Sequence, residues 1–122
     1  MIDYHQLENE LGVAFCDKNL LKLALAHSSF LNENLQTSSG SNERLEFLGD
    51  AAIGLVVAHE LYKRHPGYTE GELTELRASI VQRKSLTEVG RKLRLGQYLY
   101  MGRGEANTGG RDRDSNLARA VE

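Results

Sequence analysis

Three carboxylates lie at helical spacing in residues 43–50, and together they could bind a divalent cation. Glu43, Glu46 and Asp50 are separated by three and then by four residues. In a helix this spacing places the side chains on one face, over roughly 10 Å of its length. Carboxylate oxygens are the ligands that Mg²⁺ prefers. A simpler interpretation is also open, because acids in the first turns of a helix favour its dipole and often remain solvated.

The helix that must carry these acids favours the metal site. Its pattern runs over residues 43–64, with Asn42 or Ser41 as the cap and the His-Pro-Gly sequence at 65–67 as the stop. Apolar residues cover nearly all of its sides, which predicts a central helix on which His59 is a hydrogen-bonded core residue. Carboxylates on such a helix are costly unless a cation meets them.

Helical periodicity dominates the rest of the chain, and no segment of four or more residues alternates as a strand should. The sequence therefore predicts an all-α fold. Polar or glycine-rich composition predicts loops over residues 32–42 and 102–114. The other expected helices are one from Asp3 to Gly12, one from Asp17 to His27, one opened by a capping box at Thr69, one over residues 85–93 ended by Gly96, and a last one capped by Ser115.

Length and composition are those of one folded domain. The chain has 122 residues, 40% hydrophobic and 26% charged, so we expect a single domain over residues 1–122. Because the sequence stops inside a predicted helix, we expect this domain to be truncated at its C-terminal end. The formal net charge is −2, so binding to a polyanion would need local basic patches or metal ions.

Location is indicated by what the sequence lacks. It has no apolar run of about 18 residues and no secretory signal. The lone Cys16 can form no intramolecular disulfide, and we expect it to be a small buried residue. These features favour a cytoplasmic protein without a membrane anchor.

Four blocks of this sequence resemble the ribonuclease III family, in the family's order. The most specific is NERLEFLGDA at residues 42–51, which is similar to the family signature. LAHSSF at 25–30 resembles its histidine-containing segment, and YTEGELTELRA at 68–78 resembles the next block. GRGE at 102–105 with the glycines at 109–110 resembles its glycine-rich loop. The resemblance therefore covers most of the chain.

The resemblance implies an all-α endonuclease domain that forms a twofold homodimer through its signature helices. It implies a Mg²⁺-dependent endoribonuclease, with Mn²⁺ as a possible substitute, that takes part in RNA processing. Such an enzyme hydrolyses phosphodiester bonds of double-stranded RNA and leaves 5′-phosphate and 3′-hydroxyl ends. Duplex RNA of A-form geometry would be bound through its groove shape, 2′-hydroxyls and phosphates rather than its base edges.

The resemblance also assigns roles to individual residues of this chain. Glu46, Asp50 and Glu122 match the acidic metal ligands, with Asp50 and Glu122 as the catalytic residues. Glu43 matches the first acid of the signature and Glu70 an acid associated with RNA processing or with support of the site.

A large aromatic such as Phe47 is by default a core residue, but the resemblance implies that it forms a dimer contact and enters a pocket of the partner. Two small positions nearby, Gly49 and Gly54, are expected to permit the close approach of that other chain.

Arg119 departs from the family pattern, which has Asp three residues before the final Glu. A helix starting at Ser115 would place Arg119 one turn from Glu122, so we expect its guanidinium to lie toward or beside the carboxylates. The departure leaves open a relative that binds RNA without cutting it. An ordinary all-α partner-binding module is a third interpretation, but it would not explain buried acids.

Four further residues have less distinctive surroundings. His27 ends an apolar helix, and we expect it to be a packed, hydrogen-bonded residue rather than a catalytic one. Arg103, Arg111 and Arg113 lie in the glycine-rich loop among acids. Phosphate contact and a solvated loop are equally open for them.

Overall fold

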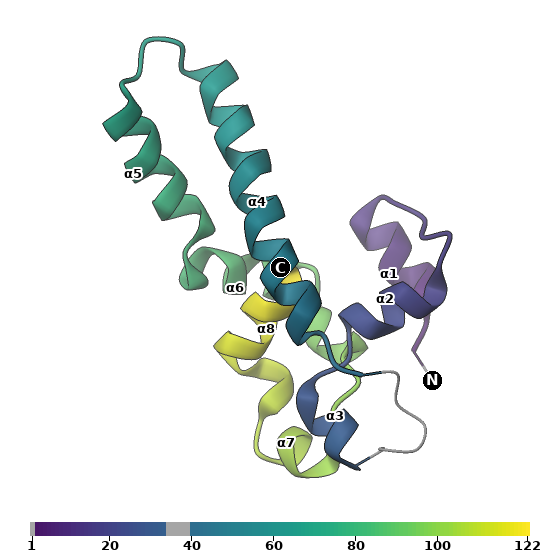
Figure 1. The fold of residues 1–122 in the computed structure, drawn as a ribbon. Coiled ribbons are helices and arrows are strands. Elements are labelled where there is room, and N and C mark those ends of the chain that lie inside the picture. The colour runs from purple at the N-terminus through teal and green to yellow at the C-terminus, as the bar shows by residue number, and fades with distance from the viewer. Residues whose placement is uncertain (1, 34–39) are drawn as a thin grey trace.

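The computed structural model describes residues 2–33 and 40–122. These residues form an all-α fold, as the sequence predicts (Figure 1). Ala26 and Tyr100 form an isolated parallel β-bridge. The α-helices are α1 (Tyr4–Leu11), α2 (Lys18–Ala24), α3 (Ser28–Glu33), α4 (Glu43–Arg64), α5 (Glu70–Val81), α6 (Arg83–Lys92), α7 (Arg103–Asn107) and α8 (Asp114–Val121); the short 3₁₀ helices are η1 (Leu95–Tyr98) and η2 (Gly110–Asp112).

Helices α4 and α5 form a long antiparallel hairpin that extends away from the other helices (Figure 1). The predicted bounds of α4 are confirmed, and His65 is its C-terminal cap. The predicted capping box is also confirmed, because the Thr69 hydroxyl accepts from the Glu72 N–H and the Glu72 carboxylate accepts from the Thr69 N–H. The hairpin therefore follows from local sequence signals.

The first two helices begin at the predicted caps. The Asp3 and Asp17 carboxylates accept backbone N–H groups at the starts of α1 and α2. Helix α2 ends at Ala24, earlier than predicted, because the following backbone pairs with Tyr100 instead of continuing the helix: the Tyr100 N–H donates to the Leu25 carbonyl at 2.9 Å. Helix α3, where no helix was predicted, follows this pairing; residues 34–39 of the predicted loop lie outside the described residues.

The prediction of an irregular segment over residues 102–114 is wrong in part. Helices α7 and η2 form within it. The glycines permit this compact path: a Cβ on Gly110 would lie 2.6 Å from the Glu105 carbonyl oxygen. Gly96 likewise lies inside η1 rather than ending the preceding segment. Helix α8 begins at Asp114, one residue before the predicted start at Ser115.

Exposure of α4 corrects a second expectation. Of its residues only Gly49 and Leu61 are buried within this chain, so α4 is not a central helix here. His59 is exposed rather than a core residue, and Cys16 is exposed rather than buried. Apolar periodicity reports what a helix could bury, whereas its burial depends on which elements reach it. None of the described helices is long and apolar enough to cross a membrane.

The core lies where α8, η1 and the segment after η1 pack against the N-terminal helices. Leu117 of α8 is 2% exposed, and α6 meets α8 at Gly90, where a Cβ would lie 3.1 Å from the Leu117 Cβ. Helix α8 is therefore fixed in the core by its middle residues. The buried cluster consists of Leu7, Leu21, Leu25, Leu95, Tyr98, Leu99, Met101 and Leu117.

We predict that Leu117→Ala lowers the free energy of unfolding by about 2–5 kcal/mol, because it removes a fully buried side chain and leaves a cavity. Urea denaturation followed by circular dichroism measures the change. The matched control is Leu20→Ala, the same deletion at an exposed position, which should cost well under half as much. Equal losses for the two variants would contradict this placement of the core.

Candidate metal centre

Helices α4 and α8 bring three of the predicted ligands together. Glu46 and Asp50 lie on the first half of α4, and Glu122 follows the last residue of α8. These carboxylates line one hollow of about 360 Å³. Glu43 also lines it, so the three carboxylates at helical spacing in residues 43–50 all reach the same hollow. The complete lining is Glu43, Glu46, Phe47, Asp50 and Glu122.

The two helices meet at Gly49, between the two ligands on α4. A Cβ built on Gly49 would lie 1.6 Å from the Glu122 carbonyl oxygen, closer than any two such atoms can approach. A side chain at this position would therefore push the end of α8 away from α4. The expectation that Gly49 makes room for another chain is wrong, because its own chain occupies that room. At Gly54, by contrast, a Cβ would meet no other atom of the described residues within 4 Å.

Like charges in this hollow make ionisation of Glu122 costly. Partial burial raises the pKa of Glu122 most, and the neighbouring Asp50 and Glu46 carboxylates raise it further. Arg119 acts in the opposite direction and lowers the pKa of Glu122. The hollow therefore favours either a proton or a cation among its carboxylates.

Arg119 lies beside the acids, as the sequence predicts. Its Nε is 3.5 Å from the Glu46 Oε1, with the two side chains 48% and 26% exposed. It lines a second, mostly apolar hollow of about 530 Å³, which Glu46 and Glu122 also line. Its ion pair is with Glu46 of α4 rather than with Glu122 of its own helix.

The donor chemistry of the acid hollow fits a hard divalent ion, since four carboxylates line it and the charges of Asp50 and Glu46 raise the pKa of Glu122. The side chains are not arranged as a closed cage. Within residues 2–33 and 40–122, no three His, Cys, Asp or Glu side chains are placed to hold an ion as they stand. Glu46 faces Arg119 instead. Binding would thus require small side-chain movements.

Glu70 lies apart from the other acids within this chain. It is the first residue of α5, beside the end of α4, and lines a hollow of about 510 Å³ with Leu61 and Tyr62. Asp50 lies fourteen residues before the last residue of α4, roughly 20 Å along the helix. The chain alone does not bring Glu70 to the carboxylate cluster.

Phe47 is 83% exposed although it is a large aromatic residue. It lines the acid hollow between the ligand positions of α4. Further exposed apolar side chains follow along the same helix, a pattern typical of a surface that another molecule covers. They are Leu48, Leu55, Val56 and Tyr62.

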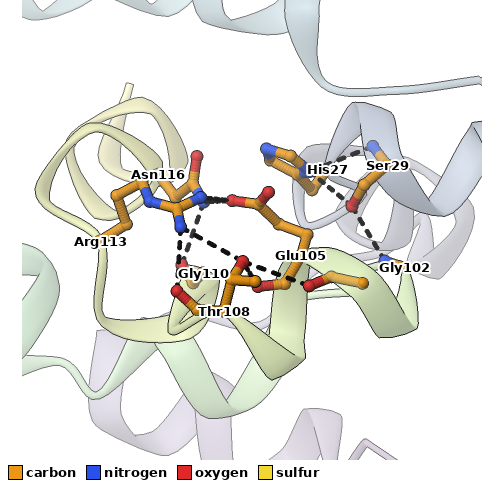
Figure 2. A network of polar contacts seen from close by, with 9 residues as sticks. His27, Ser29, Gly102, Glu105, Thr108, Gly110, Arg113 and Asn116 are labelled. Carbon is orange, nitrogen blue, oxygen red and sulfur yellow. Dashed lines mark hydrogen bonds and ion pairs between the residues drawn. The ribbon is translucent and has the colours of Figure 1, made fainter.

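A polar network holds the start of α8 in place (Figure 2). The buried Asn116 amide donates to the Glu105 carboxylate and to the Gly110 carbonyl, both at 3.0 Å. Arg113 pairs with the same carboxylate and donates to the Thr108 carbonyl at 3.0 Å. This network links α7 to α8 and so positions the helix that ends in Glu122.

His27 belongs to the adjoining part of this network. Its Nδ1 lies 2.7 Å from the Ser29 hydroxyl, which accepts the Gly102 N–H at 2.9 Å. Burial is the main cause that lowers the pKa of His27, and the charge of Arg119 lowers it too. These contacts agree with the structural role expected for His27 (Figure 2).

Sequence reasoning missed Asn116 and Ser29 as residues that position the site. Both are short polar residues next to predicted helix boundaries, where they usually act as caps, and capping gives no signal of long-range contact. Arg111 was left open between phosphate contact and solvent, and its guanidinium donates to the Gly96 and Leu99 carbonyls. Arg111 therefore holds the loop.

Comparison with known proteins assigns the chain and its fold to a family. Residues 17–122 match the family described as Ribonuclease-III-like. Ribonuclease 3 of Dehalococcoides mccartyi strain CBDB1 is 51% identical over all 122 residues, and that of Pelotomaculum thermopropionicum is 54% identical over 116 residues, or 95% of the chain. The alignments cover 52% and 48% of these relatives, so the chain spans about half their length.

The nuclease domain of ribonuclease III from Campylobacter jejuni has the same fold. A solved structure of that domain superimposes with a TM-score of 0.88 at 41% identity, covering 98% of this chain and 79% of that one. That domain is described as flexible in a region involved in dimer formation. Identity of this level over nearly the whole chain, together with the matching fold, shows that the chain belongs to the ribonuclease III family and has the fold of its nuclease domain.

Proposed function

We propose that the protein is a Mg²⁺-dependent endoribonuclease that hydrolyses double-stranded RNA to 5′-phosphate and 3′-hydroxyl ends during RNA processing. Residues 1–122 make up its nuclease domain. The observation that carries the proposal is the convergence of Glu46, Asp50 and Glu122 from two helices on one hollow, in a chain about half identical to proteins named Ribonuclease 3. A cytoplasmic location remains an expectation from the sequence.

Each acid has a distinct part in this activity. Glu46, Asp50 and Glu122 would hold the ion through carboxylate oxygens. A bound Mg²⁺, or Mn²⁺, supplies an activated water and stabilises charge on the leaving 3′-oxygen. Gly49 lets the end of α8 approach α4, which brings Glu122 close enough to Asp50 for the Asp50 charge to raise the pKa of Glu122. Glu43 adds further negative charge to the hollow, so the cation would be needed to offset the repulsion between these carboxylates and the phosphates of RNA.

The partner that covers α4 is, in this proposal, a second copy of the chain. Phe47 lines the acid hollow, and other exposed apolar side chains follow along α4. A dimer-forming region is reported for the Campylobacter jejuni domain. A twofold axis that passes near the middle of α4, perpendicular to the helix, would place the two α4 helices antiparallel. The start of each α4 would then lie near the end of the other.

This arrangement gives Glu70 a place in the site. Glu70 lies near the end of α4, so the partner's α4 would present its first turn, including Glu43, to that region. An antiparallel dimer thus brings an acid of each chain toward the acid hollow of the other. Support of the site by Glu70 depends on assembly in this proposal, not on the fold of one chain.

The alternative of a relative that binds RNA without cutting it gains no support. It rests on Arg119, which pairs with Glu46 and leaves Asp50 and Glu122 in their hollow. The relatives found by comparison carry the name Ribonuclease 3. A partner-binding module without catalysis would not account for carboxylates from two helices crowded into one hollow.

We predict that Asp50→Asn reduces cleavage of duplex RNA about 100-fold or more in the full-length protein, because a neutral amide binds Mg²⁺ poorly and several kcal/mol of transition-state stabilisation depend on the ion. Gel analysis of an end-labelled duplex measures the rate, with single-stranded RNA expected to survive. Glu88→Gln, an exposed acid on α6, is the control and should cut normally. Unchanged cleavage by the Asp50 variant would remove the metal assignment.

We predict that Phe47→Ala weakens the dimer by about 2 kcal/mol or more, roughly a thirtyfold rise in the dissociation constant, because it deletes an aromatic anchor. Sedimentation equilibrium over a concentration series measures this constant. Val89→Ala trims an exposed apolar residue of α6 and should leave it unchanged. A parent protein that is monomeric at micromolar concentration would rule out the interface.

We predict that Glu122→Gln stabilises the protein in chelator and makes it less stable than the parent in Mg²⁺. Because the pKa of Glu122 is raised in the fold, its ionisation opposes folding once the pH passes the ordinary glutamate value. In chelator at pH 7 the variant should therefore melt higher than the parent, and the difference should shrink as the pH falls below 4.5, where both states bind the proton. At Mg²⁺ a hundredfold above its Kd, the parent should gain about 2.7 kcal/mol.

Thermal melts in chelator and in Mg²⁺, each over a pH series, measure both effects. The variant should gain much less from Mg²⁺ than the parent. Glu88→Gln again serves as the control and should follow the parent in every buffer. A variant that melts below the parent in chelator at pH 7 would show that Glu122 is stabilised by other contacts and is not crowded by its neighbours.

A further inference from the structure

Arg119 is the cation that lies against the predicted ligands. It reaches from α8 to α4, where its Nε lies 3.5 Å from the Glu46 Oε1. Its charge also lowers the pKa of Glu122, so it acts on ligands of both helices. A guanidinium stays charged at any pH at which the protein folds and offers a rigid set of donors to a carboxylate. Arg119 is therefore a permanent part of the charge balance of the site.

Glu46 lies between two different surroundings. It lines the acid hollow together with Asp50 and Glu122, and it lines the neighbouring apolar hollow together with Arg119. Glu46 therefore contacts a fixed cation and also borders the space where an ion would bind. A carboxylate shared between two positive charges is the arrangement found in two-metal sites, where the ions are about 3.5–4 Å apart.

We propose that Arg119 takes the place of a second metal ion, so that this centre binds one divalent ion per chain. The ion would bind among Glu46, Asp50 and Glu122, and Arg119 would supply the other positive charge through Glu46. This inference rests on the proposed function of the site. Arg119 is in this sense a positioning residue: it pairs with Glu46 from the neighbouring apolar hollow and repels a second ion there.

The net charge of the cluster also predicts one divalent ion per chain. The four carboxylates of the acid hollow and the Arg119 guanidinium leave three negative charges, which one divalent ion reduces to one. With Asp at position 119 the cluster would have five negative charges, and two divalent ions would be needed to reach the same balance. Mg²⁺ commonly keeps several waters, so three protein carboxylates suffice for one ion.

The test is the number of ions bound, measured without RNA. Electron paramagnetic resonance of free Mn²⁺, titrated into the full-length protein, gives the stoichiometry directly. We expect one Mn²⁺ per chain for the parent and two for Arg119→Asp. Arg83→Asp makes the same change of charge at the exposed first residue of α6 and should bind one. Two ions in the parent, none in the parent, or one in Arg119→Asp would each overturn the inference.

Two further variants guard against a folding defect and separate charge from shape. Arg119→Glu also places a carboxylate at position 119 and should bind two ions. It replaces Arg119→Asp in the test if that variant does not fold. Arg119→Lys keeps the positive charge and should still bind one ion. The number of Mn²⁺ ions bound by the parent protein can refute the inference even without any variant.

Cleavage rates separate this inference from the proposed function. The rate for duplex RNA should rise with about the first power of Mg²⁺ concentration in the parent and about the second power in Arg119→Asp. A parent that binds one ion but does not cut RNA would refute the function and leave the ion count standing. A parent that cuts RNA with two ions bound would refute the ion count and leave the proposed function standing.

Discussion

The contact of the α8 end with Gly49 is the constraint on which the site depends. Packed helices ordinarily lie 8–10 Å apart, at a distance set by the side chains between them. At Gly49 there is no side chain, and the Glu122 carbonyl occupies the position that a Cβ would take. The acid of α8 thereby reaches those of α4. Asn116 fixes the other end of α8, so the carboxylate cluster is held by one close approach and one buried amide.

Much of the fold could be predicted because its signals are local. Caps at Asp3, Asp17 and Thr69 define helix starts through hydrogen bonds made within a few residues, and such bonds depend little on the rest of the chain. The spacing of Glu46 and Asp50 fixes their common face once the helix is known. The ligand set that joins Glu122 to them came from the family resemblance, since no local pattern links residues more than seventy positions apart.

The remaining errors come from features that depend on distant parts of the chain. Helix α2 ends early because the backbone of Leu25 pairs with that of Tyr100. No residue near Leu25 in the sequence indicates this pairing. His59 was expected in the core because periodicity shows that a helix is apolar without showing what covers it. Gly49 was assigned to another chain for the same reason. In each case the residue type was informative about packing, and the identity of the packing partner could not be read from the sequence.

The adjacency of Glu46 and Phe47 connects assembly to chemistry in the proposed dimer. Both line the acid hollow, so a partner that covers Phe47 also covers one wall of that hollow and removes water from it. Lower local polarity strengthens the attraction between carboxylates and a cation and makes their mutual repulsion more costly. Dimer formation and cation binding should therefore favour each other. In the single chain Phe47 is exposed, and the acid hollow lacks the wall that the partner would supply.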